Sequence, residues 1–250
     1  MSEVLDRPAE PPDAVLRYAD RADGVIDLFV PAGSGGHPVV VLLHGGFWRK
    51  RWDRRHVRPM AHALADSGCV VAAPEYRRGA VSWPAMRADV QAVASELPGM
   101  LAELGVQTSR TTWAGHSAGG HLALWLATES PASPVERVVG LAPVADLRYA
   151  LDHHLGQDAA RDMLGPLVSD SEVTEADPAQ RLEARPAADI VVLHGTADTN
   201  VPVESSRRLV RRHRWITYVE LPDADHFELI DPVSRVWPQV LHALTDSSCE

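Results

Sequence analysis

A glycine-rich segment in the middle of the chain places one serine between a strand and a helix. The segment reads Gly115-His116-Ser117-Ala118-Gly119-Gly120. Residues 110–114 before it are typical of a short buried strand, and residues 118–128, rich in Ala and Leu, are typical of a helix. A G-x-S-x-G sequence at such a turn is the pattern of a nucleophile elbow, in which glycines permit a sharp bend that exposes the serine hydroxyl. Ser117 is therefore the candidate nucleophile, with a helix-capping serine as the alternative.

A serine nucleophile needs a base, and the base needs an acid that orients it. In chains with this elbow the groups follow in the order serine, acid, histidine. His226 is the best-placed base, because it lies in a polar turn between the strand-like run 216–221 and a terminal helix. Asp198 is the best-placed acid, because it lies in the loop after the apolar strand 189–195. We predict a triad of Ser117, Asp198 and His226.

Other acids and histidines compete for these roles. Asp146, after a strand over 135–141, is the main rival acid, whereas Asp223 and Asp225 lie almost beside the histidine that they would have to orient. The pair His153-His154 suggests a metal, but adjacent residues diverge on a helix and no Cys or carboxylate spacing completes a ligand set. We therefore expect no metal and no cofactor.

The developing oxyanion of acyl transfer needs hydrogen-bond donors. An uninterrupted apolar strand over 39–43 is followed at once by His44-Gly45-Gly46-Phe47-Trp48. Glycines after an early strand let the backbone approach a substrate carbonyl, as in the corresponding loop of lipases and esterases. We expect the N–H groups of Gly45 and Gly46, together with that of Ala118 after the nucleophile, to form the oxyanion hole.

These motifs resemble those of α/β-hydrolases of the short esterase type and, within that group, those of kynurenine formamidase (arylformamidase). The resemblance rests on residues 44–48, 115–122 and 225–227, and it spans roughly residues 38–244. It implies a cofactor-free serine hydrolase that cleaves an aryl formamide such as N-formyl-L-kynurenine through an acyl-enzyme. The same motifs occur in acetyl, feruloyl and general carboxylesterases, so a short-chain ester is the alternative substrate. A non-catalytic binding module is a third hypothesis, which the intact order of serine, acid and histidine argues against.

Aromatic residues near the expected catalytic loops are candidates for substrate binding. Phe47 and Trp48 directly follow the oxyanion glycines, and at least one of them should wall off the acyl side. Trp83 lies at the start of a helix, and His116 lies inside the elbow. The basic run 49–58 is typical of a solvated surface segment. The alternative is that one of its arginines binds a substrate carboxylate near the mouth of the pocket.

Strand-like and helix-like segments alternate along most of the chain. This alternation predicts an α/β fold with a mostly parallel sheet and helices on both faces. Residues 1–14 contain three prolines and are expected to form a flexible N-terminal arm, with a single domain over 15–250. Residues 144–187 break the rhythm, and we expect a small cap-like helical excursion over the active site there.

Composition and charge indicate which binding partners and which cellular compartment to expect. A formal net charge of −10 argues against nucleic acid as a partner. No run approaches the ~18 consecutive apolar residues of a membrane helix, and the acidic start lacks the pattern of a signal peptide. The two cysteines, Cys69 and Cys249, do not suggest a disulfide framework. We expect a cytoplasmic protein that acts on a small molecule without a membrane partner, and the sequence leaves open a homo-oligomer.

Overall fold

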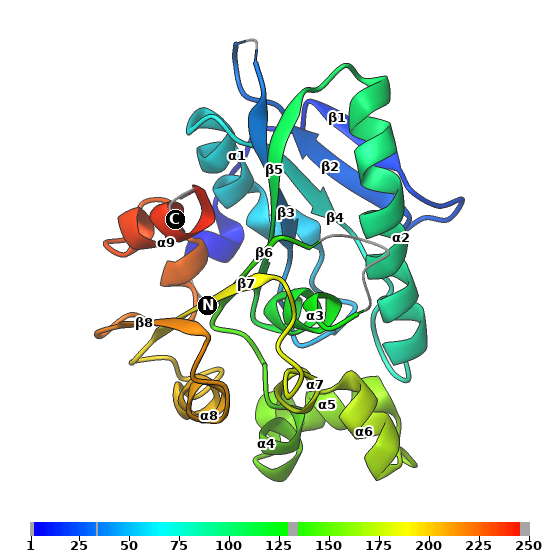
Figure 1. Cartoon of the computed structure of the whole chain (residues 1–250), viewed down its shortest axis with the longest axis vertical. Helices are drawn as coiled ribbons and strands as arrows, with labels where there is room; N and C mark the ends of the chain where they lie inside the picture. The colour runs from blue at the N-terminus through cyan, green and yellow to red at the C-terminus, as the bar shows by residue number, and fades with distance from the viewer. Residues whose placement is uncertain (1–2, 34, 130–134, 246–250) are drawn as a thin grey trace.

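The computed structural model describes residues 3–33, 35–129 and 135–245, and these residues build one twisted sheet with helices on both faces (Figure 1). Within them the sheet has eight strands in the order β1-β2-β4-β3-β5-β6-β7-β8. The strands are β1 (Ala14–Arg17), β2 (Val25–Phe29), β3 (His37–Leu43), β4 (Val70–Pro74), β5 (Thr108–His116), β6 (Arg137–Leu141), β7 (Asp189–Gly195) and β8 (Thr217–Leu221).

The strands from β4 to β8 pair in parallel, and β1 and β2 add an antiparallel edge. The described α-helices are α1 (Arg58–Asp66), α2 (Trp83–Glu103), α3 (Ala118–Ala127), α4 (Leu147–Asp152), α5 (Leu155–Leu164), α6 (Asp170–Ala176), α7 (Pro178–Arg181), α8 (Glu204–Arg212) and α9 (Trp237–Thr245). Short 3-10 helices are η1 (Glu3–Asp6), η2 (Arg54–Val57) and η3 (Glu228–Ile230).

Two apolar layers hold the helices against the sheet. One layer packs α1 and α9 on one face, and the other packs α2, α3 and α8 on the opposite face. The central strands are buried on both faces, which explains their continuous runs of Val, Leu and Ala rather than an alternating pattern. Helix α3 is buried along its whole length, so its apolar residues do not need a polar side.

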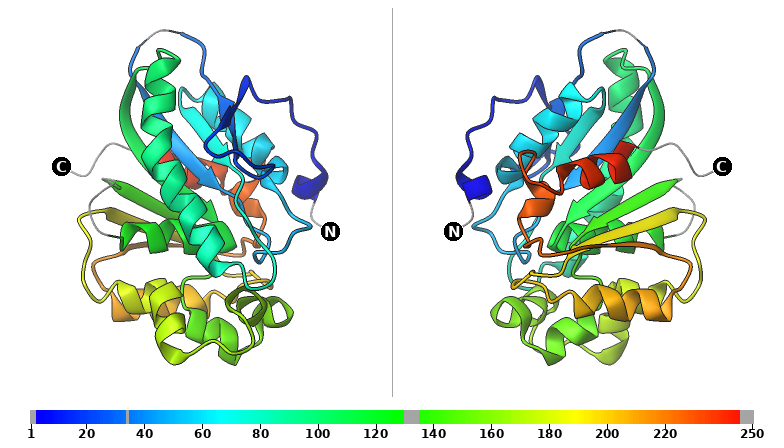
Figure 2. Two further views of the ribbon diagram at one scale, coloured as in Figure 1. Left: turned by 90° about the vertical axis from the view of Figure 1, so that its right-hand side faces the viewer. Right: turned by 90° about the vertical axis from the view of Figure 1, so that its left-hand side faces the viewer.

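The expected fold class is confirmed by the parallel sheet and its flanking helices. Four short helices, α4 to α7, fill the segment between β6 and β7 and lie together at one end of the molecule (Figure 2). They occupy residues 147–181, within the stretch 144–187 for which a helical excursion is expected.

Residues 3–14 differ from the loose arm that their prolines suggest. Val4 is 1% exposed and belongs to the core layer on the side of α1 and α9. Arg7 forms an ion pair of 2.8 Å with Asp231, and the carbonyl of Glu10 accepts a hydrogen bond from His62. Apolar burial and an ion pair thus hold this segment against the domain. Cys69 is buried as a free thiol, and Cys249 lies outside the described residues.

Candidate active site

The nucleophile elbow lies at the carboxyl end of β5, in the middle of the sheet. Ser117 has φ 56° and ψ −115°, a conformation that side chains rarely adopt and that occurs mainly where function demands it. Its N–H donates to the carbonyl of Leu141 at 2.9 Å, which ties the elbow to the end of β6. A Cβ on Gly119 would lie 2.1 Å from the carbonyl oxygen of Leu43, so only glycine fits where α3 crosses β3.

The predicted base and acid lie in contact, although they come from different loops. Nδ1–H of His226 donates to Oδ2 of Asp198 at 2.6 Å, and both side chains are buried. The other carboxylate oxygen, Oδ1, accepts two backbone N–H bonds of 2.8 Å, from Asn200 and Val201. These bonds fix the carboxylate and leave Nε2 of the histidine as the ring nitrogen available to a proton from the substrate side.

A second histidine supports the same carboxylate. Nε2 of His194 lies 3.3 Å from Oδ2 of Asp198 and donates to the carbonyl of Val201 at 2.9 Å. Burial alone raises the pKa of the Asp198 carboxyl, but the hydrogen bonds from His194 and His226 outweigh it and hold that pKa well below its usual range. The sequence gives no sign of this role, because a histidine at the end of an apolar strand is indistinguishable from a core histidine.

The glycine loop after β3 rests on a buried charged network. Nδ1 of His44 lies 2.8 Å from the carbonyl oxygen of Gly45, and Nε2 lies 2.8 Å from the Glu75 carboxylate. Both partners are acceptors, so His44 bridges the Gly45 carbonyl and the Glu75 carboxylate. Because C=O and N–H point in opposite directions across a trans peptide, holding the Gly45 carbonyl towards His44 turns the N–H of Gly46 the other way.

The loop then bends in a left-handed conformation. Gly46, Phe47 and Trp48 all have positive φ, at 112°, 50° and 55°. A Cβ on Gly45 would lie 3.2 Å from Cβ of Ser117, and a Cβ on Gly46 would lie 2.5 Å from Cβ of Trp52. The glycines therefore let the backbone lie directly against the nucleophile, as an oxyanion loop requires.

Ser117 and His226 line one cavity of about 340 Å³. Among the described residues the Ser117 hydroxyl has no hydrogen-bond partner, an arrangement common in unliganded sites, where the catalytic hydrogen bonds shorten when substrate binds. The cavity is also lined by Leu5, Gly46, Phe47, Arg49, Arg51, Trp52, His56, His116, Gly156, Gln157, Asn200 and Phe227.

Of the four predicted substrate-binding residues, the structure brings two to this cavity. Phe47 and His116 line it. Trp48 and Trp83 do not, because both indoles pack into the core against His121, with ring centroids 5.1 Å and 5.4 Å away. The positive φ of Trp48 turns its side chain inward, and consecutive sequence positions give no sign of that reversal.

His116 contacts both the backbone and the ring of His226, the predicted base. Its Nε2–H donates to the backbone carbonyl of His226 at 3.0 Å, and the two rings lie 4.4 Å apart. Burial, and to a lesser extent the neighbouring His226, lower the pKa of His116 well below the usual value for histidine. His116 is therefore neutral and holds the backbone that carries the base.

The other charged candidates fall outside the triad. Asp146, the rival acid, caps α4 through the N–H of Tyr149 and pairs with Arg208 at 3.1 Å. Within the basic run, Arg49 donates to the carbonyls of Gly156 and Gln157 in α5. It thereby links the glycine loop to the four short helices α4 to α7, which we call the cap helices.

Among the described residues no group of three His, Cys, Asp or Glu side chains could hold a metal ion. No helix in the described part of the chain combines the length and apolar character needed to cross a bilayer.

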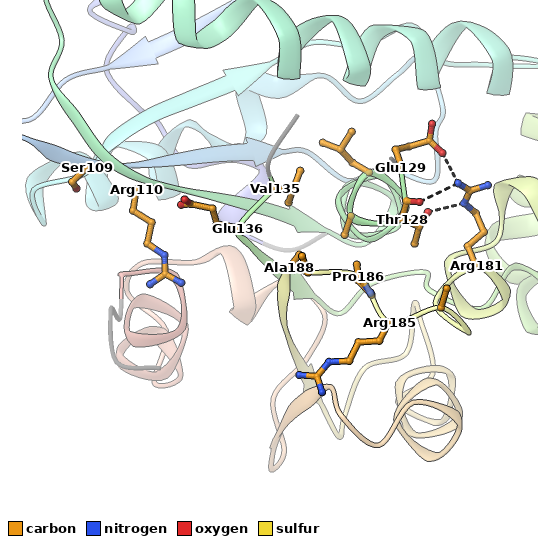
Figure 3. A pocket seen from close by; sticks show the side chains of 14 residues that line it. Ser109, Arg110, Thr128, Glu129, Val135, Glu136, Arg181, Arg185, Pro186 and Ala188 are labelled. Atoms are coloured by element: carbon orange, nitrogen blue, oxygen red, sulfur yellow. Dashed lines mark hydrogen bonds and ion pairs between the residues drawn. The ribbon is translucent and has the colours of Figure 1, made fainter. Parts of the chain in front are cut away.

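A larger cavity of about 860 Å³ lies near the amino ends of the central strands, away from the elbow (Figure 3). On its wall, Ser109 lies at the amino end of β5, and Glu136 and Ala188 directly precede β6 and β7, whereas the elbow lies at the carboxyl end of β5. Arg181, also on the wall, hydrogen-bonds Thr128 and pairs with a neighbouring glutamate. Ligands of open α/β sheets bind at the carboxyl ends of strands, so size alone does not make this cavity the functional site.

A mostly parallel sheet with a serine elbow after β5, an acid after β7 and a histidine after β8 defines the α/β-hydrolase fold. The sequence pattern of the BD-FAE family matches residues 26–212, and the chain belongs to this family. The match includes the elbow and Asp198 but ends before His226.

Two similar proteins are ester hydrolases by name. A probable carboxylic ester hydrolase, LipM of Mycobacterium tuberculosis, is 29% identical over 220 residues, which are 79% of this chain and 51% of LipM. Esterase LipC of the same organism is 28% identical over 218 residues, 78% of this chain and 54% of LipC. The chain thus spans about half the length of the curated relatives it matches.

Solved structures share the fold. A truncated carbohydrate esterase from gut microbiota has a TM-score of 0.77 at 18% identity and covers 95% of this chain and 97% of its own. Esterase 2 of Thermogutta terrifontis, phosphoramylated by tabun, has a TM-score of 0.72 at 22% identity, with 94% and 93% covered.

Proposed function

We propose that the protein is a serine esterase that hydrolyses small carboxylic esters through an acyl-enzyme. The observation that carries the proposal is the hydrogen bond of 2.6 Å between His226 and Asp198 at the wall of the cavity that also holds Ser117. The names of the relatives, a carboxylic ester hydrolase and an esterase, support the same chemistry.

The proposed reaction uses the chain's own groups. Ser117 Oγ attacks the ester carbonyl while Nε2 of His226 takes its proton, and Asp198 stabilises the imidazolium that forms. The N–H groups of Gly46 and Ala118, with that of Gly45, stabilise the oxyanion. The imidazolium then gives its proton to the departing alcohol. A water molecule repeats the sequence on the acyl-enzyme and releases the carboxylic acid.

The test of this proposal is covalent labelling combined with turnover. The wild-type protein should react with a fluorophosphonate probe and hydrolyse para-nitrophenyl acetate, because only an activated serine does both. Ser117→Ala should abolish labelling and reduce kcat by about 10⁴-fold or more. Labelling that persists at another residue of the variant, with turnover intact, would refute the assignment.

A second candidate substrate is an aryl formamide such as N-formyl-L-kynurenine. It is favoured by the packing of Phe47, a residue of the cavity wall, against α5, where its ring lies 2.7 Å from the position of a Cβ on Gly156. A formyl group carries only hydrogen on its carbonyl and fits a narrow acyl side, and aromatic Trp52 and Phe227 line the same cavity. Under either candidate the acyl chain should be short.

Comparing kcat/KM for N-formyl-L-kynurenine with para-nitrophenyl acetate, butyrate and octanoate distinguishes the candidates. Preference for the formamide would favour the formamidase, and preference for acetate would favour the short-chain esterase. Phe47→Ala should improve the longer acyl chains relative to acetate, because it removes the wall on the cap side. Efficient octanoate turnover by the wild-type protein would contradict the narrow acyl side.

A further inference from the structure

The catalytic cavity continues into a second hollow of about 410 Å³. Leu5, Arg51, Trp52 and His56 line both hollows, so the two form one groove that runs outward from Ser117. A substrate longer than the reacting ester therefore has a path away from the nucleophile, along the N-terminal segment and η2.

The groove is basic although the protein is acidic. Among the residues whose side chains the structure describes, the inner cavity is lined by two arginines and by no carboxylate, and the outer hollow is lined by four arginines and one aspartate, Asp53. The whole chain carries a formal net charge of −10. Like charges gathered at one cleft raise the local concentration of ligands of the opposite sign, so this groove favours an anionic substrate.

Most of these arginines are already paired. Arg49 is held by two cap carbonyls and lies 3.4 Å from Asp162. In the outer hollow Arg7 pairs with Asp231, and Arg58 pairs with Asp27 at 2.8 Å. Arg55 pairs loosely, at 3.8 Å, with Asp53. Arg7, Arg55 and Arg58, which line the outer hollow, are therefore engaged in ion pairs within the protein.

Arg51 differs from its neighbours. Among the described residues its exposed guanidinium makes no ion pair and no hydrogen bond, and it stacks over the Trp52 ring at 5.4 Å. Trp52 itself packs against the oxyanion loop, since a Cβ on Gly46 would lie 2.5 Å from its Cβ. The indole thus holds an uncommitted cation at the wall of the cavity that contains Ser117, with the planar fork that recognises carboxylates.

The N-terminal segment forms part of the wall of the same two hollows. Val4 is buried in the core layer and anchors the segment, and Leu5 next to it lines both hollows beside Arg51. An apolar wall displaces part of the water around a bound anion, and charge pairs strengthen as water is excluded. Arg51 is therefore better placed to discriminate charge than an arginine on an open surface.

We propose that Arg51 is an anion subsite, and that the substrates of this esterase carry a carboxylate group that this guanidinium binds within the groove. The proposal rests on the esterase function proposed above and names the class of substrate for it. The carboxylate can belong to the alcohol part or to the acyl part of the ester, and the experiment separates these two sources.

The experiment measures charge preference as a ratio of kcat/KM values for matched substrates. Para-acetoxybenzoate and neutral para-acetoxybenzamide test the alcohol side. Monomethyl glutarate and methyl pentanoate test the acyl side, with acid release followed in a pH-stat. Ratios are compared between wild type, Arg51→Gln and Arg55→Gln, so the intrinsic reactivity of each ester cancels. Arg55 is the matched control, because it is an exposed arginine of the same run that lines only the outer hollow.

In one of the two substrate pairs, Arg51→Gln should lower the ratio of kcat/KM for the anionic substrate to kcat/KM for the neutral one. We expect a decrease of about five-fold, the effect of one partly exposed charge pair. Arg55→Gln should leave the ratio within about two-fold of wild type, and added salt should weaken the wild-type preference. Equal effects of the two variants, or unchanged ratios in both pairs, would overturn the subsite while leaving the esterase intact. Absence of turnover of every neutral ester and of para-nitrophenyl acetate would instead overturn the esterase function itself.

Discussion

Replacing Asp198 by Asn removes the charge of the proposed acid with almost no change of shape. Oδ1 of Asp198 accepts two backbone N–H bonds, from Asn200 and Val201. The single acceptor oxygen of asparagine must therefore stay on that side, because an NH₂ group there would face two donors. The NH₂ group is then forced into the place of Oδ2, where it faces Nδ1 of His226 at 2.6 Å.

Two donors cannot share that contact, so the tautomer of His226 must change. Nδ1 loses its hydrogen and accepts from the new amide, and the hydrogen moves to Nε2. With Nε2 protonated the ring cannot take the proton of Ser117. We expect kcat/KM to fall about 10⁴-fold, the effect of a wrong tautomer in a serine triad, which is about 5.5 kcal/mol of transition-state stabilisation.

The assay is steady-state hydrolysis of para-nitrophenyl acetate, with thermal unfolding followed by circular dichroism to verify the fold. Asp146→Asn is the matched control. Asparagine still caps α4, and only the ion pair with the half-exposed Arg208 is lost, so the rate should stay within about two-fold of wild type. An Asp198→Asn protein that is folded and retains more than a tenth of the activity would refute the reasoning. Greater damage from Asp146→Asn would transfer the acid role to Asp146.

Three further outcomes are expected. His56, His116 and His121 all have lowered pKa values, about 3 for His56 and about 4 for His121. Near pH 5 these three imidazoles therefore bind about three more protons in the unfolded chain than in the folded protein, and their contribution to the free energy of unfolding should drop by roughly 4 kcal/mol per pH unit as the pH falls from about 6 to 5. Urea unfolding measures this slope, which His121→Gln should reduce by about a third; a flat profile would contradict neutral buried imidazoles. Gly46→Ala places a Cβ 2.5 Å from Trp52 at φ 112°, and it should lower kcat about 10²-fold if this loop supplies an oxyanion donor; unchanged kcat would remove Gly46 from that role. Activity should survive EDTA, and loss that zinc restores would overturn the metal-independent mechanism.

The sequence predicts the fold because its signals are local. Continuous apolar runs mark the buried parallel strands, and the glycines around Ser117 mark the bend between β5 and α3. The order of serine, acid and histidine also directs attention to Asp198 and His226, which the structure brings into hydrogen-bond contact. Their catalytic roles remain predictions for the variants above to test.

The parts that the sequence does not predict depend on contacts between distant segments. The inward turn of Trp48 follows from three successive positive φ angles, which no residue type there requires. The support of Asp198 by His194 depends on the path of the loop between them. The N-terminal segment is polar and rich in proline, and the buried Val4 and the Arg7–Asp231 pair reveal that it is docked.

The strand order has a consequence for inactivation. His226 follows β8, which lies at the edge of the sheet and pairs on one side only, with β7. Ser117 follows β5, which is paired on both sides. Edges and termini of a domain open locally at lower free energy than its centre. In a denaturant titration the triad should therefore come apart at its histidine while the rest of the sheet persists, and the loss of turnover should precede the loss of secondary structure.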